Sequence, residues 1–192
     1  MKIQPMTGKK PNRRTKVILP PREPQALLIC GLLSPDSKLI KSIEQTLSDH
    51  FGQVALRSEV MPFDWTDYYN AEMGEGILRR WVVFSKPINL LQSWELKLKT
   101  CEIEDGLKQD GKRTVNIDPG LVRLDGLWLF STKPAGHRTY LDEGIWIELT
   151  VRFLKERCDE LPWTYPDHRD PGVQLFMLKA RELLKKQLSD NE

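Results

Sequence analysis

Residues 25–33 read QALLICGLL, an almost unbroken run of apolar side chains. A strand with one wet face alternates apolar and polar residues, whereas a strand packed on both faces is apolar throughout. We therefore predict a buried central strand here. A helix is expected next, because apolar residues recur at Ile40, Ile43 and Leu47, and Gly52 can end it.

Outward from this strand, strands and helices alternate along the chain. Further strands are predicted at 54–60, 78–84, 114–117, 126–130 and 144–154, with helices at 87–104 and from Pro171, which Asp170 can cap. Through residue 118 the order is strand, helix, strand, strand, helix, strand, which is that of a ferredoxin-like βαββαβ core. The predicted class is α+β, with this core extended by further antiparallel strands and a C-terminal helix.

Length and charge divide the chain into a tail and a body. The 192 residues, 40% of them hydrophobic, suit one domain, predicted at 25–192. Residues 1–22 carry seven basic and no acidic residues, whereas the rest carries 22 basic and 27 acidic ones. The basic, Pro-containing segment 1–24 is expected to be a flexible tail, either simply solvated or able to attract phosphates through its charge.

Composition also excludes some classes of protein. Three scattered cysteines, Cys30, Cys101 and Cys158, form neither a disulfide framework nor a CxxC pair, which favours a reducing cytoplasm. No apolar run reaches the roughly 18–20 residues of a membrane span, so no membrane partner is expected.

A glycine-rich stretch, Gly106–Arg113, matches the first seven positions of the phosphate-loop pattern GxxxxGK[ST]. The eighth position, whose hydroxyl would bind Mg²⁺, is Arg113. A phosphate loop also needs a strand before it and a helix after it, and here the predicted order is reversed. We therefore interpret the stretch as a turn that precedes a strand.

Two polar stretches are candidates for a site. In NIDPG (116–120), Asn116 and Asp118 share one face of the strand, and Asp118-Pro119-Gly120 is expected to turn the chain. These side chains either close that turn through backbone hydrogen bonds or form a polar cluster at a strand end. On the strand 144–154, Glu148, Thr150 and Arg152 share the face opposite the apolar residues.

That strand face has two interpretations. A solvated face needs no further explanation, because antiparallel sheets often have one wet side. If the C-terminal segment covers it, the buried charges need partners, which His137, Arg138, Glu148 and Arg152 can supply for each other or for an anion.

Two segments rich in acids and aromatics, FDWTDYYNAEMG (63–74) and LPWTYPDHR (161–169), are either packed surface loops or parts of a site. No metal signature is local in the sequence. Convergence of Asp118, Glu148 and Glu72, with His137 or Asp167, would favour Mg²⁺ or Mn²⁺, since these metals prefer oxygen ligands.

Five ordered stretches resemble one bacterial family, the domain of unknown function 4416: PFDWTDYYNAEMGEG (62–76), GKRTVNIDPGLV (111–122), HRTYL (137–141), IWIELT (145–150) and LPWTYPDHR (161–169). The resemblance covers roughly residues 25–188 and leaves out the tail. Some members are labelled GTP-binding, but the resemblance implies no catalytic residue in this chain. The stretch Gly106–Arg113 is not interpreted as a phosphate loop, so it does not support that label.

The sequence favours a polar pocket for a small anionic or phosphorylated ligand near NIDPG and HRTYL. The candidate ligand-binding residues are Asn116, Arg138, Tyr140, Arg152, Tyr69 and Tyr165. In a catalytic version Asp118 or Glu148 is the general base and His137 or Arg138 stabilises the anion. The sequence leaves open whether the protein is an enzyme.

Two alternatives remain open. In the first, the protein is an interaction or structural module whose aromatic residues contact a protein partner: Trp65, Tyr68, Tyr69, Trp163 and Tyr165. In the second, the sheet and the basic tail bind RNA, which the acidic body disfavours because an RNA-binding sheet displays basic and aromatic side chains.

Overall fold

The computed structural model describes residues 25–190, so the predicted tail at 1–24 lies outside the described residues. The strands are β1 (Gln25–Ser34), β2 (Val54–Arg57), β3 (Met61–Pro62), β4 (Leu78–Asn89), β5 (Asn116–Val122), β6 (Gly126–Ser131), β7 (Thr139–Asp142), β8 (Ile145–Phe153) and β9 (Cys158–Glu160). The helices are α1 (Ser37–Phe51), α2 (Asn70–Met73), α3 (Glu95–Gly106) and α4 (Pro171–Asp190), with a 3₁₀ turn, η1 (Pro166–Arg169), before α4.

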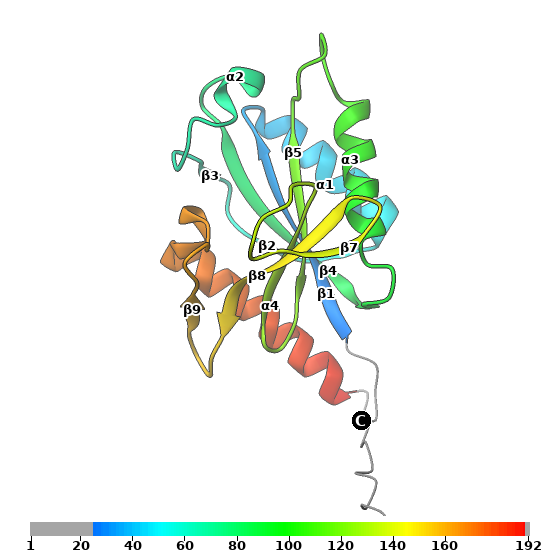
Figure 1. Cartoon of the computed structure of the whole chain (residues 1–192), viewed down its shortest axis with the longest axis vertical. Coiled ribbons are helices and arrows are strands. Elements are labelled where there is room, and N and C mark those ends of the chain that lie inside the picture. Colours follow the sequence, from blue (N-terminus) through cyan, green and yellow to red (C-terminus); the bar gives the residue numbers. More distant parts are fainter. Residues whose placement is uncertain (1–24, 191–192) are drawn as a thin grey trace, which may run out of the picture.

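All strands belong to one antiparallel sheet in the order β2-β4-β1-β5-β6-β8-β7, with β3 beside β4 and β9 beside β8 (Figure 1). The first four positions, together with the crossover helices α1 and α3, form the predicted ferredoxin-like core. The strands β6, β8 and β7 extend that core from β5, and the chain ends in α4. The predicted α+β class is therefore confirmed.

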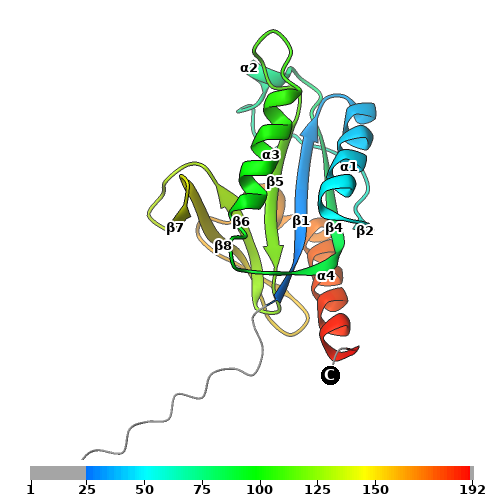
Figure 2. The same cartoon turned by 90° about the vertical axis from the view of Figure 1, so that its right-hand side faces the viewer.

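Helices cover both faces of the core sheet, which explains the apolar run in β1. Leu28, Cys30 and Leu32 of β1 lie in one buried cluster with the inner face of α1. Leu27 and Ile29, which point the other way, cluster with the inner face of α4. Figure 2 shows α1 and α3 running alongside β1 and β5. Each such fully buried aliphatic side chain contributes about 1.5–3 kcal/mol to folding.

The helix predicted at 87–104 is wrong in its first turns. Strand β4 continues to Asn89, and α3 begins at Glu95. Pro87 is compatible with the strand because β2 pairs with β4 only as far as Phe84, so one edge of β4 is open beyond it.

No helix among residues 25–190 has both the length and the apolar character needed to span a bilayer.

The turn predicted at Asp118-Pro119-Gly120 is also wrong, because β5 runs straight through it. Pro119 lies opposite Cys30 of β1, and β6 pairs with β5 only from Gly120 onward, so the missing N–H costs no hydrogen bond with β6. A Cβ at Gly120 would lie 2.5 Å from the carbonyl oxygen of Trp128, so this strand position requires glycine. As a result Asp118 lies within strand β5, and its side chain is on the same face of the strand as that of Asn116.

The prediction that Glu148, Thr150 and Arg152 share one face of β8 is wrong, because β8 has a bulge between Leu149 and Val151. Leu127 of β6 lies opposite Val151 and Leu129 lies opposite Glu148, so Glu148 shares its face with Val151, whereas Arg152 points to the other face. Segment 161–164 contacts the backbone of β8 at this bulge: Trp163 Nε1 donates to the Leu149 carbonyl at 2.8 Å and Thr164 Oγ1 to the Thr150 carbonyl at 2.5 Å. Glu148 and Thr150 are buried, whereas Arg152 is exposed and pairs with Asp159. The solvated-face interpretation is therefore wrong for the first two residues and holds only for Arg152.

Candidate functional site

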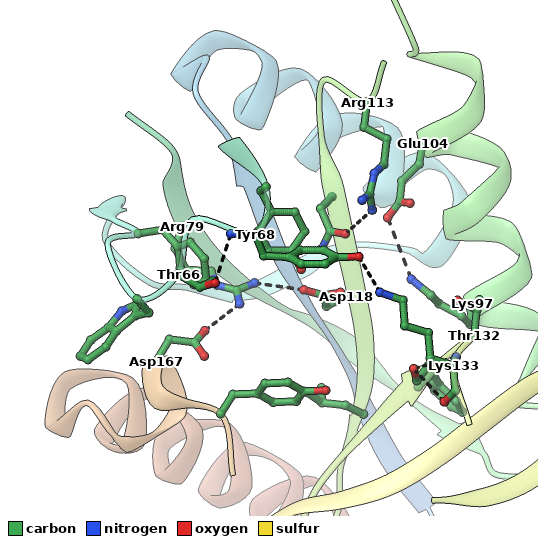
Figure 3. Close-up of a pocket in the computed structure, with 18 of the residues that line it drawn as sticks. Thr66, Tyr68, Arg79, Lys97, Glu104, Arg113, Asp118, Thr132, Lys133 and Asp167 are labelled. Atoms are coloured by element: carbon green, nitrogen blue, oxygen red, sulfur yellow. Dashed lines mark hydrogen bonds and ion pairs between the residues drawn. The ribbon is translucent and has the colours of Figure 1, made fainter. Parts of the chain in front are cut away.

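A cavity of about 680 Å³ opens between the segment before β4, helix α3, strand β5, the β6–β7 loop and η1 (Figure 3). Its lining includes five cationic side chains, Arg79, Lys97, Arg113, Lys133 and Arg138, and three carboxylates, Glu104, Asp118 and Asp167. Aromatic side chains complete the walls: Phe63, Trp65, Tyr68, Tyr69, Phe130 and Tyr165.

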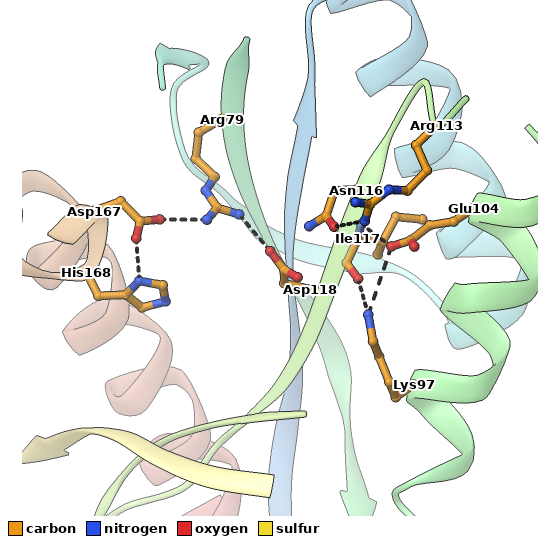
Figure 4. Close-up of polar contacts among 9 residues, drawn as sticks. All are labelled: Arg79, Lys97, Glu104, Arg113, Asn116, Ile117, Asp118, Asp167 and His168. Atoms are coloured by element: carbon orange, nitrogen blue, oxygen red, sulfur yellow. Dashed lines mark hydrogen bonds and ion pairs between the residues drawn. The ribbon is translucent and has the colours of Figure 1, made fainter. Parts of the chain in front are cut away.

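Arg79 of β4 is buried at the base of the cavity between two carboxylates (Figure 4). Its Nη2 lies 2.6 Å from Asp167 Oδ2, and its Nη1 lies 3.3 Å from Asp118 Oδ2. The guanidinium also stacks over Trp81, 4.6 Å from the ring centroid. Gly31 of β1 leaves room for this stack, since a Cβ there would lie 2.6 Å from Arg79 Nη1.

Asp167 of η1 is held ionised by its neighbours. Its Oδ1 lies 2.8 Å from Nδ1 of the buried His168. Burial by itself would raise the pKa of Asp167, but Arg79 and His168 outweigh it and hold the pKa well below the usual aspartate range. The result is a continuous chain of polar contacts from His168 through Asp167 and Arg79 to Asp118.

The side of the cavity toward α3 is polar as well. Lys97 Nζ donates to the Ile117 carbonyl at 2.9 Å, and Glu104 Oε1 accepts from the Ile117 N–H at 2.5 Å, so both side chains clamp α3 to β5. Burial raises the pKa of Glu104, an effect that Lys97 partly offsets. Next to them Arg113 donates to Asn116 Oδ1 at 3.1 Å and pairs with Glu72 of α2.

Arg138 organises the opposite wall. It donates to Glu148 Oε2 at 2.7 Å, to Ser131 Oγ at 2.8 Å and to Tyr165 Oη at 2.8 Å. Burial, reinforced by Glu148, raises the pKa of Tyr165 to about 12, so its hydroxyl stays protonated. His137 Nε2 lies 2.8 Å from the same Glu148 oxygen.

Tyr68 and Lys133 meet across the cavity, and Figure 3 shows the two side chains pointing toward one another. Lys133 Nζ donates to Tyr68 Oη at 2.6 Å, and this hydrogen bond lowers the pKa of Tyr68. Tyr69 lies deeper, and burial raises its pKa well above the usual tyrosine range. Both tyrosines come from the loop between β3 and α2.

The structure brings five of the predicted site residues into the cavity wall: Asn116, Asp118, Arg138, Tyr69 and Tyr165. His137, Glu148 and Glu72 lie behind this wall, where they contact its arginines. Tyr140 and Arg152 are exposed and are not part of the lining.

Four lining cations and two lining carboxylates did not figure among the predicted ligand-binding residues: Arg79, Lys97, Arg113, Lys133, Glu104 and Asp167. A signal existed for some of them. Arg79 interrupts an apolar strand. Lys97 and Glu104 lie four residues before and three residues after Cys101, a spacing that puts the three side chains on one side of the predicted helix. Lys133 and Arg113 have no comparable signal in the sequence. Their place in the lining depends on which loops lie next to each other in the folded chain.

The metal hypothesis finds no cluster to support it. Among residues 25–190 no three His, Cys, Asp or Glu side chains lie together as metal ligands. Asp118, Glu148 and Glu72 are separated, since each pairs with a different arginine: Arg79, Arg138 and Arg113, respectively.

Comparison with protein-family models matches residues 24–184 to the family described as Domain of unknown function (DUF4416). The chain belongs to this family. The match to DUF4416 confirms the resemblance drawn from the five sequence stretches, and it spans β1 through most of α4. Neither the curated proteins nor the solved structures gave a match to the chain. The DUF4416 description names no activity, so the function has to be argued from the cavity.

Proposed function

We propose that the cavity binds a small anionic ligand that carries a phosphate or carboxylate group. The observation that carries the proposal is the charge of the lining, with five cationic side chains against three carboxylates. The lining has more basic than acidic side chains, whereas residues 23–192 as a whole contain 22 basic and 27 acidic residues. A local positive excess in an acidic body attracts anions to that one place.

The size and walls of the cavity support the same ligand class. A volume of about 680 Å³ lies within the range of roughly 300–1,000 Å³ that small-molecule sites occupy. Tyr69 and Tyr165 both line it, and their rings can stack on a planar or apolar part of the ligand. The proposal therefore adds an aromatic or apolar portion next to the anionic group.

The geometry supports binding, and no catalytic step is proposed. Asp118, the lining carboxylate with the most exposed side chain at 28%, is already paired with Arg79. Glu148 and His137, the other two catalytic candidates, contact Arg138 or each other rather than the cavity. A divalent metal would have to arrive with the ligand, coordinated by its phosphate or carboxylate oxygens.

The observations favour a small ligand over the two alternatives. Trp65, Tyr68 and Tyr165 line the cavity itself, and Trp163 stacks on His137 with ring centroids 4.9 Å apart, so these aromatics have partners within the chain or face the cavity. The core strands pack against α1 and α3 on one face and α4 on the other, which is unlike the open aromatic sheet that binds RNA. We propose a cytoplasmic location, which the free thiols of Cys30, Cys101 and Cys158 support.

A thermal-shift screen tests the proposal. Nucleotides, sugar phosphates and common carboxylates are added to the purified protein, each with and without Mg²⁺ or Mn²⁺. A ligand at 100 times its dissociation constant adds about 2.7 kcal/mol of stability, which raises Tm by several degrees.

Two charge-matched variants locate the response. Lys133→Met removes a lining cation, whereas Lys99→Met removes a lysine that pairs with Glu102 on α3 and is not in the lining. We expect the ligand to raise Tm in the unaltered chain and in Lys99→Met, but not in Lys133→Met. A flat screen with every anion, or a shift that both variants keep, would overturn the proposal and favour capture of a protein partner as the next experiment.

A further inference from the structure

The five lining cations differ in what their release would cost. Arg79 and Arg138 pair with carboxylates that are themselves buried: Asp167 is 5% exposed and Glu148 is 1% exposed. Pulling either arginine toward a ligand would leave a buried carboxylate without its cation, which is strongly unfavourable. Lys97 is buried too, and its ammonium holds the Ile117 carbonyl. These three cations are therefore fixed parts of the wall.

Arg113 and Lys133 have partners that can be given up. Arg113 pairs with Glu72, which is 44% exposed, and Lys133 donates to Tyr68, which is 58% exposed. A carboxylate or phenol released at the surface is taken up by water, so its loss costs little. A ligand anion that replaces Glu72 or Tyr68 therefore keeps each cation paired at small cost.

Both partners belong to one short segment. Residues 64–72, which we call the gate segment, lie between Phe63 and Met73, two buried side chains of one apolar cluster. Seven of the nine gate residues are exposed. Tyr69 packs on the same cluster, so the gate segment moves on either side of it. Residues 64–68 and 70–72 can shift while Phe63, Tyr69 and Met73 stay packed, because little apolar surface has to leave the core with them.

We infer that an anion enters the cavity by partner exchange, in which Arg113 and Lys133 give up Glu72 and Tyr68 for the ligand and release the gate segment. The inference rests on the proposed function and adds which cations the ligand takes and what moves. Tyr68 bridges the cavity to Lys133 in the closed state (Figure 3), so the same hydroxyl that closes the cavity competes with the ligand.

Anion titrations of the full chain test the exchange, with inorganic phosphate and inorganic pyrophosphate as probes. Tyr68→Phe removes the competing hydroxyl, and Glu72→Gln weakens the competing carboxylate. Each is expected to tighten binding about two- to five-fold, the range that loss of an exposed ion pair or hydrogen bond gives. Tyr140→Phe and Glu102→Gln are the matched controls, because both side chains are exposed and neither lines the cavity.

Hydrogen exchange of the backbone amides adds a second measurement. Phosphate should speed exchange in residues 64–72 of the unaltered chain and leave it unchanged in Lys133→Met. If Lys133→Met weakens phosphate binding while Tyr68→Phe and Glu72→Gln bind as the unaltered chain does, the gate is wrong and the site stands. If no variant binds either probe, including the Tyr68→Phe/Glu72→Gln double variant, the site and the gate fail together.

Discussion

Arg79 Nη2 and Asp167 Oδ2 lie 2.6 Å apart, with both side chains only 5% exposed, although 88 residues of chain separate them. Arg79 belongs to β4 and Asp167 to η1, so this one contact ties the core sheet to the segment that leads into α4. It also sets the base of the cavity, because Arg79 in turn holds Asp118 of β5.

Asp167→Asn should lower the free energy of unfolding by about 3 kcal/mol, since it leaves the Arg79 cation buried with only the more distant Asp118 as its partner. Urea denaturation measures the change. The control is Asp159→Asn, which breaks the more exposed pair with Arg152 and should cost under about 1 kcal/mol. Equal costs in the two variants would contradict a structural role for the buried pair.

Stability should depend on pH through the same carboxylate. The pKa of Asp167 is lower in the folded than in the unfolded chain, because Arg79 and His168 outweigh the effect of burial. Its contribution is therefore complete above the ordinary aspartate value of about 4 and is lost as the pH falls below it.

Unfolding free energies measured from pH 7 down to pH 3 check this. The difference between the unaltered chain and Asp167→Asn should shrink below about pH 4. Glu104, whose pKa burial raises, acts with the opposite sign but is present in both proteins. A difference that stays constant over this range would show that Asp167 is not held ionised.

Gly31→Ala should lower the free energy of unfolding by about 1–3 kcal/mol, the usual cost of overpacking. The added Cβ would lie 2.6 Å from Arg79 Nη1 and 2.7 Å from Trp81 Cζ3, so the stacked pair has to shift. A thermal melt should show a drop of several degrees. Gly136→Ala is the control, because nothing lies within 4 Å of its Cβ position; an equal drop there would contradict the explanation.

Lys97→Met should cost more stability than the double variant Lys97→Met/Glu104→Gln. The single change leaves a buried carboxylate without the nearby ammonium, whereas the double change also removes that charge and keeps an acceptor for the Ile117 N–H. We expect a single-variant loss of about 3 kcal/mol, of which Glu104→Gln restores part. Additive losses in chemical denaturation would show that the two side chains are uncoupled.

Much of the fold could be predicted because its causes are local or periodic. The apolar run in β1 predicted burial on both faces, and the order of elements predicted the ferredoxin-like core. Asp170 was predicted to cap the last helix, and its Oδ1 accepts from the Val173 N–H at 3.0 Å. The errors came where Pro87 and Pro119 suggested a break in the strand, because only the extent of the neighbouring strands shows that each is tolerated.

The candidate site could be predicted only in part. Asn116, Asp118 and Arg138 were found because polar residues on a strand face or next to one need an explanation. Lys133 and Arg113 were missed. Arg113 was considered only as the eighth position of the stretch Gly106–Arg113, and the place of both residues in the lining depends on which loops lie next to each other.

By itself the sequence determined the class of fold, the central strand and the family, because hydrophobic periodicity and ordered motifs are properties of neighbouring residues. The tertiary structure alone decided which charges pair. Arg79 finds its carboxylates 39 and 88 residues further along the chain, and Lys133 finds Tyr68 across 65 residues. Arg79 pairs with its carboxylates because a buried charge needs a partner, and Lys133 meets Tyr68 because two loops lie side by side. No spacing in the sequence records either contact.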